Sequence, residues 1–312
     1  MSALDRYRHL LDADLAAFIE AHERGFPTDL ATQPLDRQRA VYGEMCRAFH
    51  APTPADIEIL DTALEFPDRT ILLRIYRPLG RKGVATVLYF HGGGFVFGDL
   101  DSHGDMCAEL CSRADVDVIS VDYRLAPEHL HPAAFDDAMA AFAWTARTFG
   151  RPPILFGESA GGALAAAVSH KARHDPARPH GLVLVYPGLG SHGDLPSFSE
   201  HAEAPLLSAA EIGEYQAVRL GDAGDATDPA VNPLRDTDYA GLPRTFVSVP
   251  EFDPLRDEGE LYCERIRAAG GNAVCTVEPG LVHSFLRART RVARAAEAFD
   301  RIVDAVKSMS AS

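Results

Sequence analysis

The stretch PILFGESAGG, residues 153–162, places a serine in the middle of a glycine-rich junction. Its first four residues predict a short buried strand, whereas ALAAAVSHKAR at 163–173 consists mostly of good helix formers. Ser159 therefore falls on a strand-to-helix turn, where small residues at 157 and 161 let strand and helix pass closely. A serine on so sharp a turn presents its hydroxyl outward, so we interpret Ser159 as a nucleophile. The alternative is a glycine-rich turn at which Ser159 only caps the helix.

Strands and helices alternate on both sides of this junction. Most of these strands are apolar along their whole length, which is typical of a parallel sheet covered by helices on both faces. The pattern predicts the α/β class, with a mostly parallel central sheet flanked by helices. Before it, segments 56–66 and 70–77 favour two strands joined by a turn. The alternating part comprises predicted strands at 84–90, 116–121, 153–157, 181–186, 244–250 and 273–278, and predicted helices at 101–114, 133–149, from 159, 256–269 and 285–308.

Two segments fall outside the alternating pattern. Residues 1–50 predict an N-terminal helical cap segment with two amphipathic helices, broken near 25–27. Residues 51–312 form the predicted catalytic domain, with an insertion at about 190–225 that carries a helix at 208–220. A crossover between parallel strands needs only about a dozen residues, so the insertion is surplus to the sheet. We expect both segments to form a helical cap over the carboxyl edge of the sheet, where open α/β sheets bind ligands.

A second glycine-rich segment, HGGGF at 91–95, directly follows a predicted strand. Acyl transfer places negative charge on a carbonyl oxygen, and backbone N–H groups approach such an oxygen closely only where side chains are absent. HGGG after the third strand is the pattern that forms this oxyanion hole in lipases and esterases. A further donor is expected from Ala160, the residue after Ser159. A nucleotide-binding glycine loop is disfavoured because the Gly-x-Gly-x-x-Gly register and a following lysine are absent.

We expect a histidine that acts as the base, and a carboxylate that hydrogen-bonds to this histidine, later in the chain. Their order along the chain is serine, acid, histidine. Asp253 and His283 each lie just beyond one of the last two predicted strands, which is where this order places the acid and the base. Asp253 also suits an N-cap for a helix that begins at Pro254, and both interpretations can hold together. Asp257 and Glu251 stay open as alternative acids.

These motifs resemble the hormone-sensitive-lipase family of esterases, known from bacteria as family IV. The resemblance implies the α/β-hydrolase fold with a cap, and activity on carboxylic esters, often with short acyl chains, without a cofactor or metal. It implies the nucleophile Ser159, the acid Asp253, the base His283 and the oxyanion donors Gly93, Gly94 and Ala160. The matching blocks are HGGGF (91–95), YRLAPEHLHPAA (123–134), GESAGG (157–162), DPLRDEG (253–259) and GLVHSF (280–285).

The chain departs from the family pattern at two positions. Glu158 stands where the family more often has aspartate, and Ser284 follows the histidine where glycine is usual. Neither change removes a member of the predicted triad. We expect Ser284 to alter how the base is held.

Composition disfavours several other classes of protein. The formal net charge of −15 at pH 7 argues against nucleic acid as a partner and against anionic lipid surfaces. The sequence contains no run of about 18 apolar residues, so we expect no stable membrane insertion. The five cysteines are irregularly spaced, so we interpret them as reduced thiols in a cytoplasmic protein. The resemblance leaves open the formation of a homodimer.

The sequence thus predicts a serine carboxylesterase that hydrolyses short-chain carboxylic esters through an acyl-enzyme, with a small-molecule ester as its partner. An amidase, lactonase or acyltransferase with the same triad is the alternative. A ligand-binding protein on a hydrolase scaffold is a further alternative, although such proteins usually lack a triad member.

Overall fold

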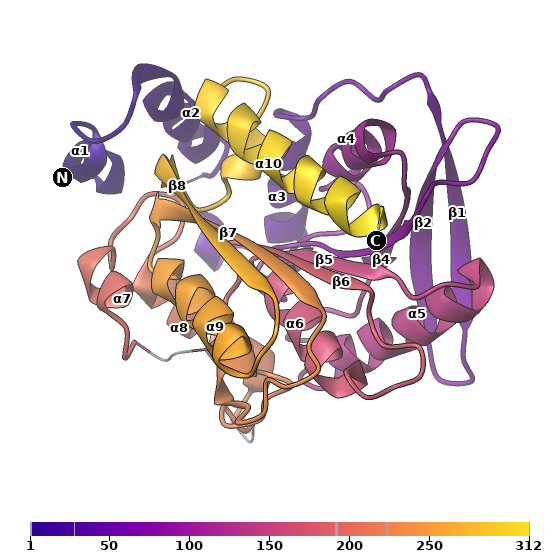
Figure 1. Cartoon of the computed structure of the whole chain (residues 1–312). Helices are drawn as coiled ribbons and strands as arrows, with labels where there is room; N and C mark the ends of the chain where they lie inside the picture. The colour runs from indigo at the N-terminus through magenta and orange to yellow at the C-terminus, as the bar shows by residue number, and fades with distance from the viewer. Residues whose placement is uncertain (1, 28, 191–192, 223, 312) are drawn as a thin grey trace.

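The computed structural model describes the whole chain except residues 1, 28, 191–192, 223 and 312. Its strands are β1 (Ile57–Glu65), β2 (Thr70–Pro78), β3 (Thr86–Phe90), β4 (Asp117–Asp122), β5 (Ile154–Glu158), β6 (Gly181–Val185), β7 (Arg244–Phe252) and β8 (Ala273–Val282). Within this described part, the eight strands form one sheet in the order β1-β2-β4-β3-β5-β6-β7-β8 (Figure 1). The hairpin β1–β2 joins β4 antiparallel, and the remaining neighbours pair in parallel. The predicted α/β architecture with a mostly parallel sheet is confirmed.

Helices cover both faces of this sheet. The helices of the described chain are α1 (Ala3–Tyr7), α2 (Ala13–Arg24), η1 (Leu30–Thr32), α3 (Leu35–Arg47), α4 (Gly104–Ala114), α5 (Ala133–Phe149), α6 (Ala160–Ala172), α7 (Pro196–Glu200), α8 (Ala209–Leu220), η2 (Pro233–Arg235), α9 (Arg256–Ala268), η3 (Phe285–Ala288) and α10 (Ala293–Ser310). Helices α4 and α10 pack on one face, and α5, α6 and α9 pack on the other (Figure 1). Along β3, Val87 and Tyr89 contact the first layer while Leu88 and Phe90 contact the second, so the strand is apolar throughout.

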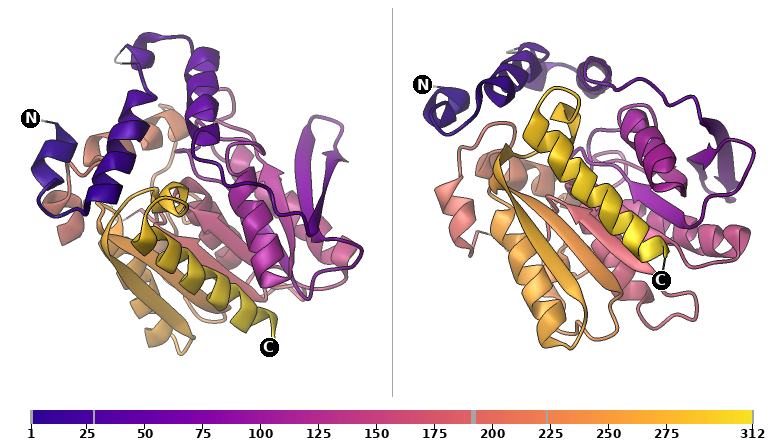
Figure 2. Two further views of the ribbon diagram at one scale, coloured as in Figure 1. Left: turned by 90° about the horizontal axis from the view of Figure 1, so that it is seen from above. Right: turned by 45° about the horizontal axis from the view of Figure 1, so that its top comes forward.

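The N-terminal helices and the helices α7 and α8 lie outside these layers. Figure 2 shows α1, α2 and α3 together at one end of the molecule. Two contacts join α1 to the region after α7: Tyr7 Oη lies 3.1 Å from His201 Nδ1, and Arg6 forms an ion pair with Glu203. The two segments that the sequence sets apart from the sheet are therefore in contact with each other.

Several predicted element boundaries were wrong. The N-terminal segment holds three α-helices rather than two, because the Asp12 side chain accepts a hydrogen bond from Leu15 N and so begins a new helix. The helix predicted from 285 begins only at Ala293. Val292 before it has extended backbone, and the preceding residues form the short 3-10 helix η3. The predicted insertion at 190–225 includes residues 191–192 and 223, which lie outside the described residues.

Within the described residues, no helix is both long and apolar enough to cross a membrane.

Candidate active site

Ser159 lies on the turn between β5 and α6, as its sequence context predicts. Its backbone has φ 52° and ψ −119°, a conformation that residues other than glycine rarely adopt. The turn is close-packed: a Cβ on Gly157 would lie 2.0 Å from Gly161 O, and a Cβ on Gly161 would lie 2.0 Å from Phe90 O. Only glycine fits either position, so the spacing of the motif follows from the close approach of strand and helix.

The structure brings Ser159, His283 and Asp253 together in series. Ser159 Oγ lies 2.9 Å from His283 Nε2, and His283 Nδ1 lies 2.7 Å from Asp253 Oδ2. Each of the three residues follows the carboxyl end of a parallel strand, β5, β7 or β8, and only β6 lies between β5 and β7. Asp253 is wholly buried and His283 nearly so. A serine, a histidine and a buried carboxylate hydrogen-bonded in this order are the arrangement found in serine hydrolases.

The neighbouring carboxylates have other partners. Asp257 accepts from Ser197 N at 2.8 Å, and Glu251 accepts from Gly280 N at 2.7 Å. Asp253 turns one oxygen to the histidine and accepts from Leu255 N with the other, also at 2.8 Å. The predicted N-cap role of Asp253 is wrong: helix α9 begins at Arg256 with Leu255 as its N-cap, and the second oxygen of Asp253 instead closes a turn onto Leu255 N.

The HGGGF loop packs directly against the serine turn. Gly93 and Gly94 have φ of 116° and 64°, and their N–H groups donate to no acceptor in the part of the chain that the structure describes. A Cβ on Gly92 would lie 3.4 Å from the Cβ of Ser159, so the loop and the serine are neighbours. Ala160 is the first residue of α6, where backbone N–H groups have no partner within the helix. These three donors and Ser159 line one cleft.

Buried aromatic rings hold this loop from below. The ring of Tyr123 stacks on His91 with centroids 4.3 Å apart, and its hydroxyl donates to His91 O at 2.7 Å. Burial lowers the pKa of His91 to about 4, so the imidazole is neutral at pH 7. Both rings are buried and stacked beneath the loop, and neither lines the cleft, so His91 and Tyr123 support the loop.

The cleft above Ser159 has a volume of about 1470 Å³. Its floor is formed by the HGGGF loop, the serine turn and the histidine loop. Its roof comes from the two segments outside the sheet, and includes His22, Phe26, Tyr42, Phe198, Leu206, Leu207 and Tyr215. The volume exceeds the roughly 300–1,000 Å³ of ordinary small-molecule sites, so it accommodates a substrate of considerable size.

The two roof segments contact the HGGGF loop and the residue that follows it. From α3, Arg39 donates to Val96 O at 2.9 Å and to Ala126 O at 3.0 Å, and it also pairs with Glu128. From α8, the ring of Tyr215 lies so close to Gly94 that a Cβ there would be 2.5 Å from it. The conformation of the loop therefore depends on the roof as well as on the sheet.

The side chain of Glu158 belongs to a buried polar cluster beneath the serine. It accepts from the hydroxyls of Tyr89, at 2.8 Å, and Tyr186, and its Oε1 lies 2.9 Å from His103 Nε2. Burial alone would raise the pKa of Glu158, but the interactions with His103, Arg287 and Tyr186 outweigh it and lower the pKa well below its usual range. The Tyr186 ring also packs against His283, with centroids 4.6 Å apart. Glu158 is therefore ionised and holds a ring that contacts the base.

Sequence reasoning missed part of this cluster. The Tyr42 hydroxyl accepts from Arg287, a contact that no sequence motif indicates. His103 lines the cleft, and His131 contacts Asp228. No motif marks Arg287, and its position four residues after His283 is the one signal that it lies near the site.

The backbone explains the second departure from the family pattern. Ser284 has φ 61° and ψ 20°, the left-handed conformation that glycine adopts most easily. Its carbonyl accepts from Arg287 N at 3.1 Å and so begins η3. Glycine is usual here because the chain must turn sharply just after the histidine, and Ser284 makes the same turn with a Cβ.

Within the described residues, no group of three or more His, Cys, Asp or Glu side chains is placed to hold a metal ion.

Comparison with known proteins places this site in a family. A family model described as the α/β hydrolase fold matches residues 87–287. The esterase LipI of Mycobacterium tuberculosis is 38% identical over 80% of this chain and 82% of its own length. The ethyl acetate hydrolase of Pseudomonas putida is 30% identical over 95% of this chain and 98% of its own.

A solved structure agrees with these relatives. An ester hydrolase from the metagenome of Lake Arreo, complexed with a derivative of bipyridine phosphonate, has a TM-score of 0.88 at 33% identity, over 97% of this chain and 100% of the other. The chain therefore belongs to the α/β-hydrolase family, and its resemblance to the hormone-sensitive-lipase group is confirmed.

Proposed function

We propose that this protein is a serine carboxylesterase in which Ser159 is the nucleophile. One observation carries the proposal: Ser159 Oγ, His283 and Asp253 form an unbroken hydrogen-bonded series at 2.9 and 2.7 Å beside the HGGGF loop. The relatives support the choice of ester, since those that share most of the chain's length are named esterase and ethyl acetate hydrolase.

Acylation follows from this geometry. As Ser159 Oγ bonds to the ester carbonyl carbon, its proton passes to His283 Nε2, and Asp253 stabilises the imidazolium through Nδ1. The carbonyl oxygen becomes an oxyanion that accepts from the N–H groups of Gly93, Gly94 and Ala160, the first two of which have no other acceptor in the described chain. The bond to the alcohol then breaks, and the alcohol leaves with the proton from His283.

Deacylation uses the same groups in reverse. Water gives one proton to His283 Nε2 while its oxygen attacks the acyl carbon, and the second oxyanion rests on the same N–H donors. Collapse of this intermediate returns the proton to Ser159 Oγ and releases the carboxylic acid. An acceptor other than water would make the protein an acyltransferase, and an amide or lactone substrate would use identical steps.

We further propose that the segments 1–50 and 190–225 act as a cap that favours short acyl chains. The whole cleft is too large to impose such a limit, so the proposal requires a wall close to Ser159. Three aromatic rings support a wall there: Tyr42 stacks on Phe97 at 5.4 Å, and Phe97 packs edge-on against Tyr215 at 6.2 Å. An apolar pocket gains about 0.8 kcal/mol per buried methylene until it is full.

The test is a rate series with p-nitrophenyl acetate, butyrate, octanoate and palmitate at matched solubility. We expect kcat/KM to peak at two to six carbons, as a wall near the serine requires. A rate that rises steadily to palmitate contradicts the cap proposal but not the esterase. Turnover of a p-nitroanilide faster than the matched ester would assign the protein as an amidase instead.

Location in the cytoplasm and assembly into a homodimer stay predictions. Cell fractionation and light scattering of the purified protein test them separately.

A further inference from the structure

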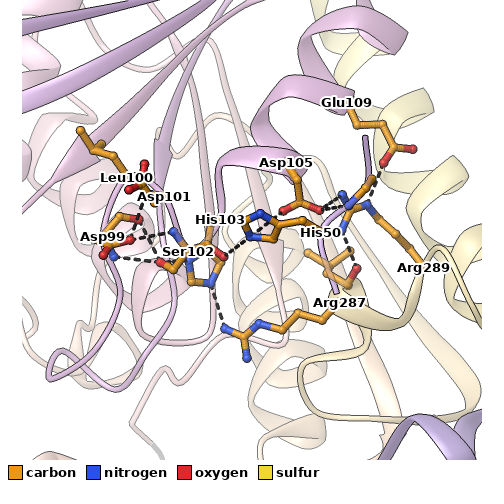
Figure 3. Close-up of polar contacts among 12 residues, drawn as sticks. His50, Asp99, Leu100, Asp101, Ser102, His103, Asp105, Glu109, Arg287 and Arg289 are labelled. Carbon is orange, nitrogen blue, oxygen red and sulfur yellow. Dashed lines mark hydrogen bonds and ion pairs between the residues drawn. The ribbon is translucent and has the colours of Figure 1, made fainter. Parts of the chain in front are cut away.

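Two arginines of the histidine loop have very different surroundings. Arg289 Nη2 lies 2.5 Å from Asp105, and its Nε lies 2.8 Å from Glu109, so two carboxylates neutralise it. Arg287, two residues earlier, instead reaches His103 (Figure 3). No ion pair joins it to a carboxylate in the described part of the chain. Arg287 is half-buried, and even a half-buried guanidinium without such a partner is unusual.

The hydrogen bonds of Arg287 leave part of its donor capacity unused. Its Nη2 donates to the hydroxyl of Tyr42, and the same atom lies 3.2 Å from His103 Nε2. Its Nε is buried and has no hydrogen-bond partner among the described residues. A guanidinium carries five N–H donors, and leaving such donors unsatisfied costs free energy.

The contact with His103 does not supply the missing acceptor. His103 Nε2 lies 2.9 Å from Glu158 Oε1, and an ionised carboxylate only accepts. His103 Nε2 must therefore carry the proton and donate to Glu158, so the nitrogen has no free lone pair for Arg287. The approach of Arg287 Nη2 to His103 is thus a contact between two donors.

Arg287 borders the substrate cleft. Arg287 lines it together with Tyr42, His103 and Ser284, next to Ser159 and His283. The lining also includes apolar side chains such as Leu206, Leu207 and Phe198. Arg287 therefore adds a polar group to a cleft that is partly apolar.

We propose that Arg287 is a specificity-determining residue that binds a second, uncharged oxygen acceptor of the ester substrate, such as a ketone, ether or further ester oxygen. The inference rests on the proposed esterase function. An uncharged acceptor fits because Glu158 already lies in the same cluster, and Glu23, Glu203, Glu211 and Glu214 line the cleft, which disfavours an anion. Because the acceptor belongs either to the acid or to the alcohol, each side has its own test.

The experiment compares esters that differ by one atom or group at constant shape. For the acid side, the pair is ethyl 4-oxopentanoate and ethyl pentanoate; for the alcohol side, 2-methoxyethyl butanoate and butyl butanoate. We expect the wild-type protein to prefer the acceptor-bearing ester in one pair. In Arg287→Met the ratio of the two kcat/KM values should fall about tenfold in that pair, since hydrogen bonds to charged groups discriminate by about that factor or more.

Arg287→Lys and Arg291→Met complete the set. Lysine retains the charge and one donor direction, so we expect a ratio between those of wild type and Arg287→Met. If Arg287→Met does not fold, a threefold or larger fall in Arg287→Lys decides for the proposal. Arg291 is exposed and donates to Ala48 O, outside the cleft, so Arg291→Met should leave both ratios unchanged.

Three outcomes overturn the inference. Ratios that are the same in wild type, Arg287→Met and Arg287→Lys would mean that Arg287 only holds Tyr42 in place. A faster rate with monoethyl succinate than with ethyl 4-oxopentanoate would exclude an uncharged acceptor. A wild-type protein that prefers the ester without the extra acceptor in both pairs would also exclude an uncharged acceptor. If no ester is hydrolysed at all, the proposed function itself fails.

Discussion

The floor and the roof of the cleft are built by different means. On the floor, each group of the site follows directly from the end of a strand: Ser159 from β5, Asp253 from β7 and His283 from β8. The roof is made of helices that no strand positions, and its key contacts join residues far apart in the chain, such as Tyr42 and Arg287, which are 245 residues apart. The reacting groups are thus fixed by the sheet, while the shape of the cleft depends on tertiary packing.

The two parts nevertheless meet at the HGGGF loop. The sheet holds this loop through His91 and Tyr123, and the roof holds it through Arg39 and Tyr215. A substitution in the floor should therefore abolish ester hydrolysis, whereas a substitution in the roof should only change its rate.

The largest effect is expected from Ser159→Ala. Loss of a triad member removes several orders of magnitude from kcat, and we expect at least a 10⁴-fold fall with p-nitrophenyl butyrate. The fold should survive, because within the described residues the Ser159 side chain forms a hydrogen bond to His283 alone. Circular dichroism and thermal unfolding serve as the control. A variant that keeps more than a few per cent of the wild-type rate would mean that another residue is the nucleophile.

A smaller effect is expected when the roof contact to the loop is cut. Arg39→Met removes the donors to Val96 O and Ala126 O that hold the segment after Gly94. A looser loop places its N–H groups less well in the transition state, so kcat should fall about tenfold while KM changes little.

The matched control for this prediction is Arg37→Met on the same helix. Arg37 is exposed and only approaches Glu44 at 3.6 Å, so its loss should leave kcat unchanged. Equal rates for both variants would mean that the roof does not act on the loop through Arg39.

The difference between floor and roof also explains which residues of the site could be predicted from the sequence. The turn at Ser159 is encoded locally, because only glycine fits at 157 and 161, and the chain order then leads to Asp253 and His283. The oxyanion loop is likewise marked by its glycines. Arg287 and Tyr42 carry no such local mark, since each depends on a partner brought close by folding. The same holds for the three-helix N-terminal segment, where a single cap at Asp12 changes the number of helices.

A third prediction concerns pH and Asp122, the last residue of β4, which lies in the sheet but outside the triad. Burial, and then the charges of Asp99 and Asp101, raise the pKa of Asp122 from 3.8 to about 6. Below pH 3.8 the carboxyl is neutral in both folded and unfolded chains. Between 3.8 and 6 only the unfolded chain ionises, so the wild-type protein loses stability as the pH rises. Asp122→Asn does not titrate and should be more stable than wild type at pH 8 by about 1–2 kcal/mol, a value reduced for partial solvent exposure.

Urea unfolding at pH 4 and pH 8 checks this difference. The gain in the free energy of unfolding should be present at pH 8 and shrink towards zero near pH 4. Parallel stability curves for the two proteins would show that Asp122 keeps its ordinary pKa in the folded chain.

The smallest effect is expected at Ser284, where the floor departs from the family pattern. A non-glycine residue in the left-handed region costs about 1–2 kcal/mol, and Ser284 stands there with φ 61°. Ser284→Gly removes that strain, but glycine makes the unfolded chain more flexible, which costs about 0.4–1 kcal/mol. The net gain should be about 0.5 kcal/mol, or a rise of roughly 1–2 °C in Tm for a chain of this size. Ser284→Ala is the matched control, because it loses the hydroxyl but keeps the Cβ and therefore the strain. If alanine stabilises the protein as much as glycine does, the hydroxyl rather than the backbone is the source of the cost.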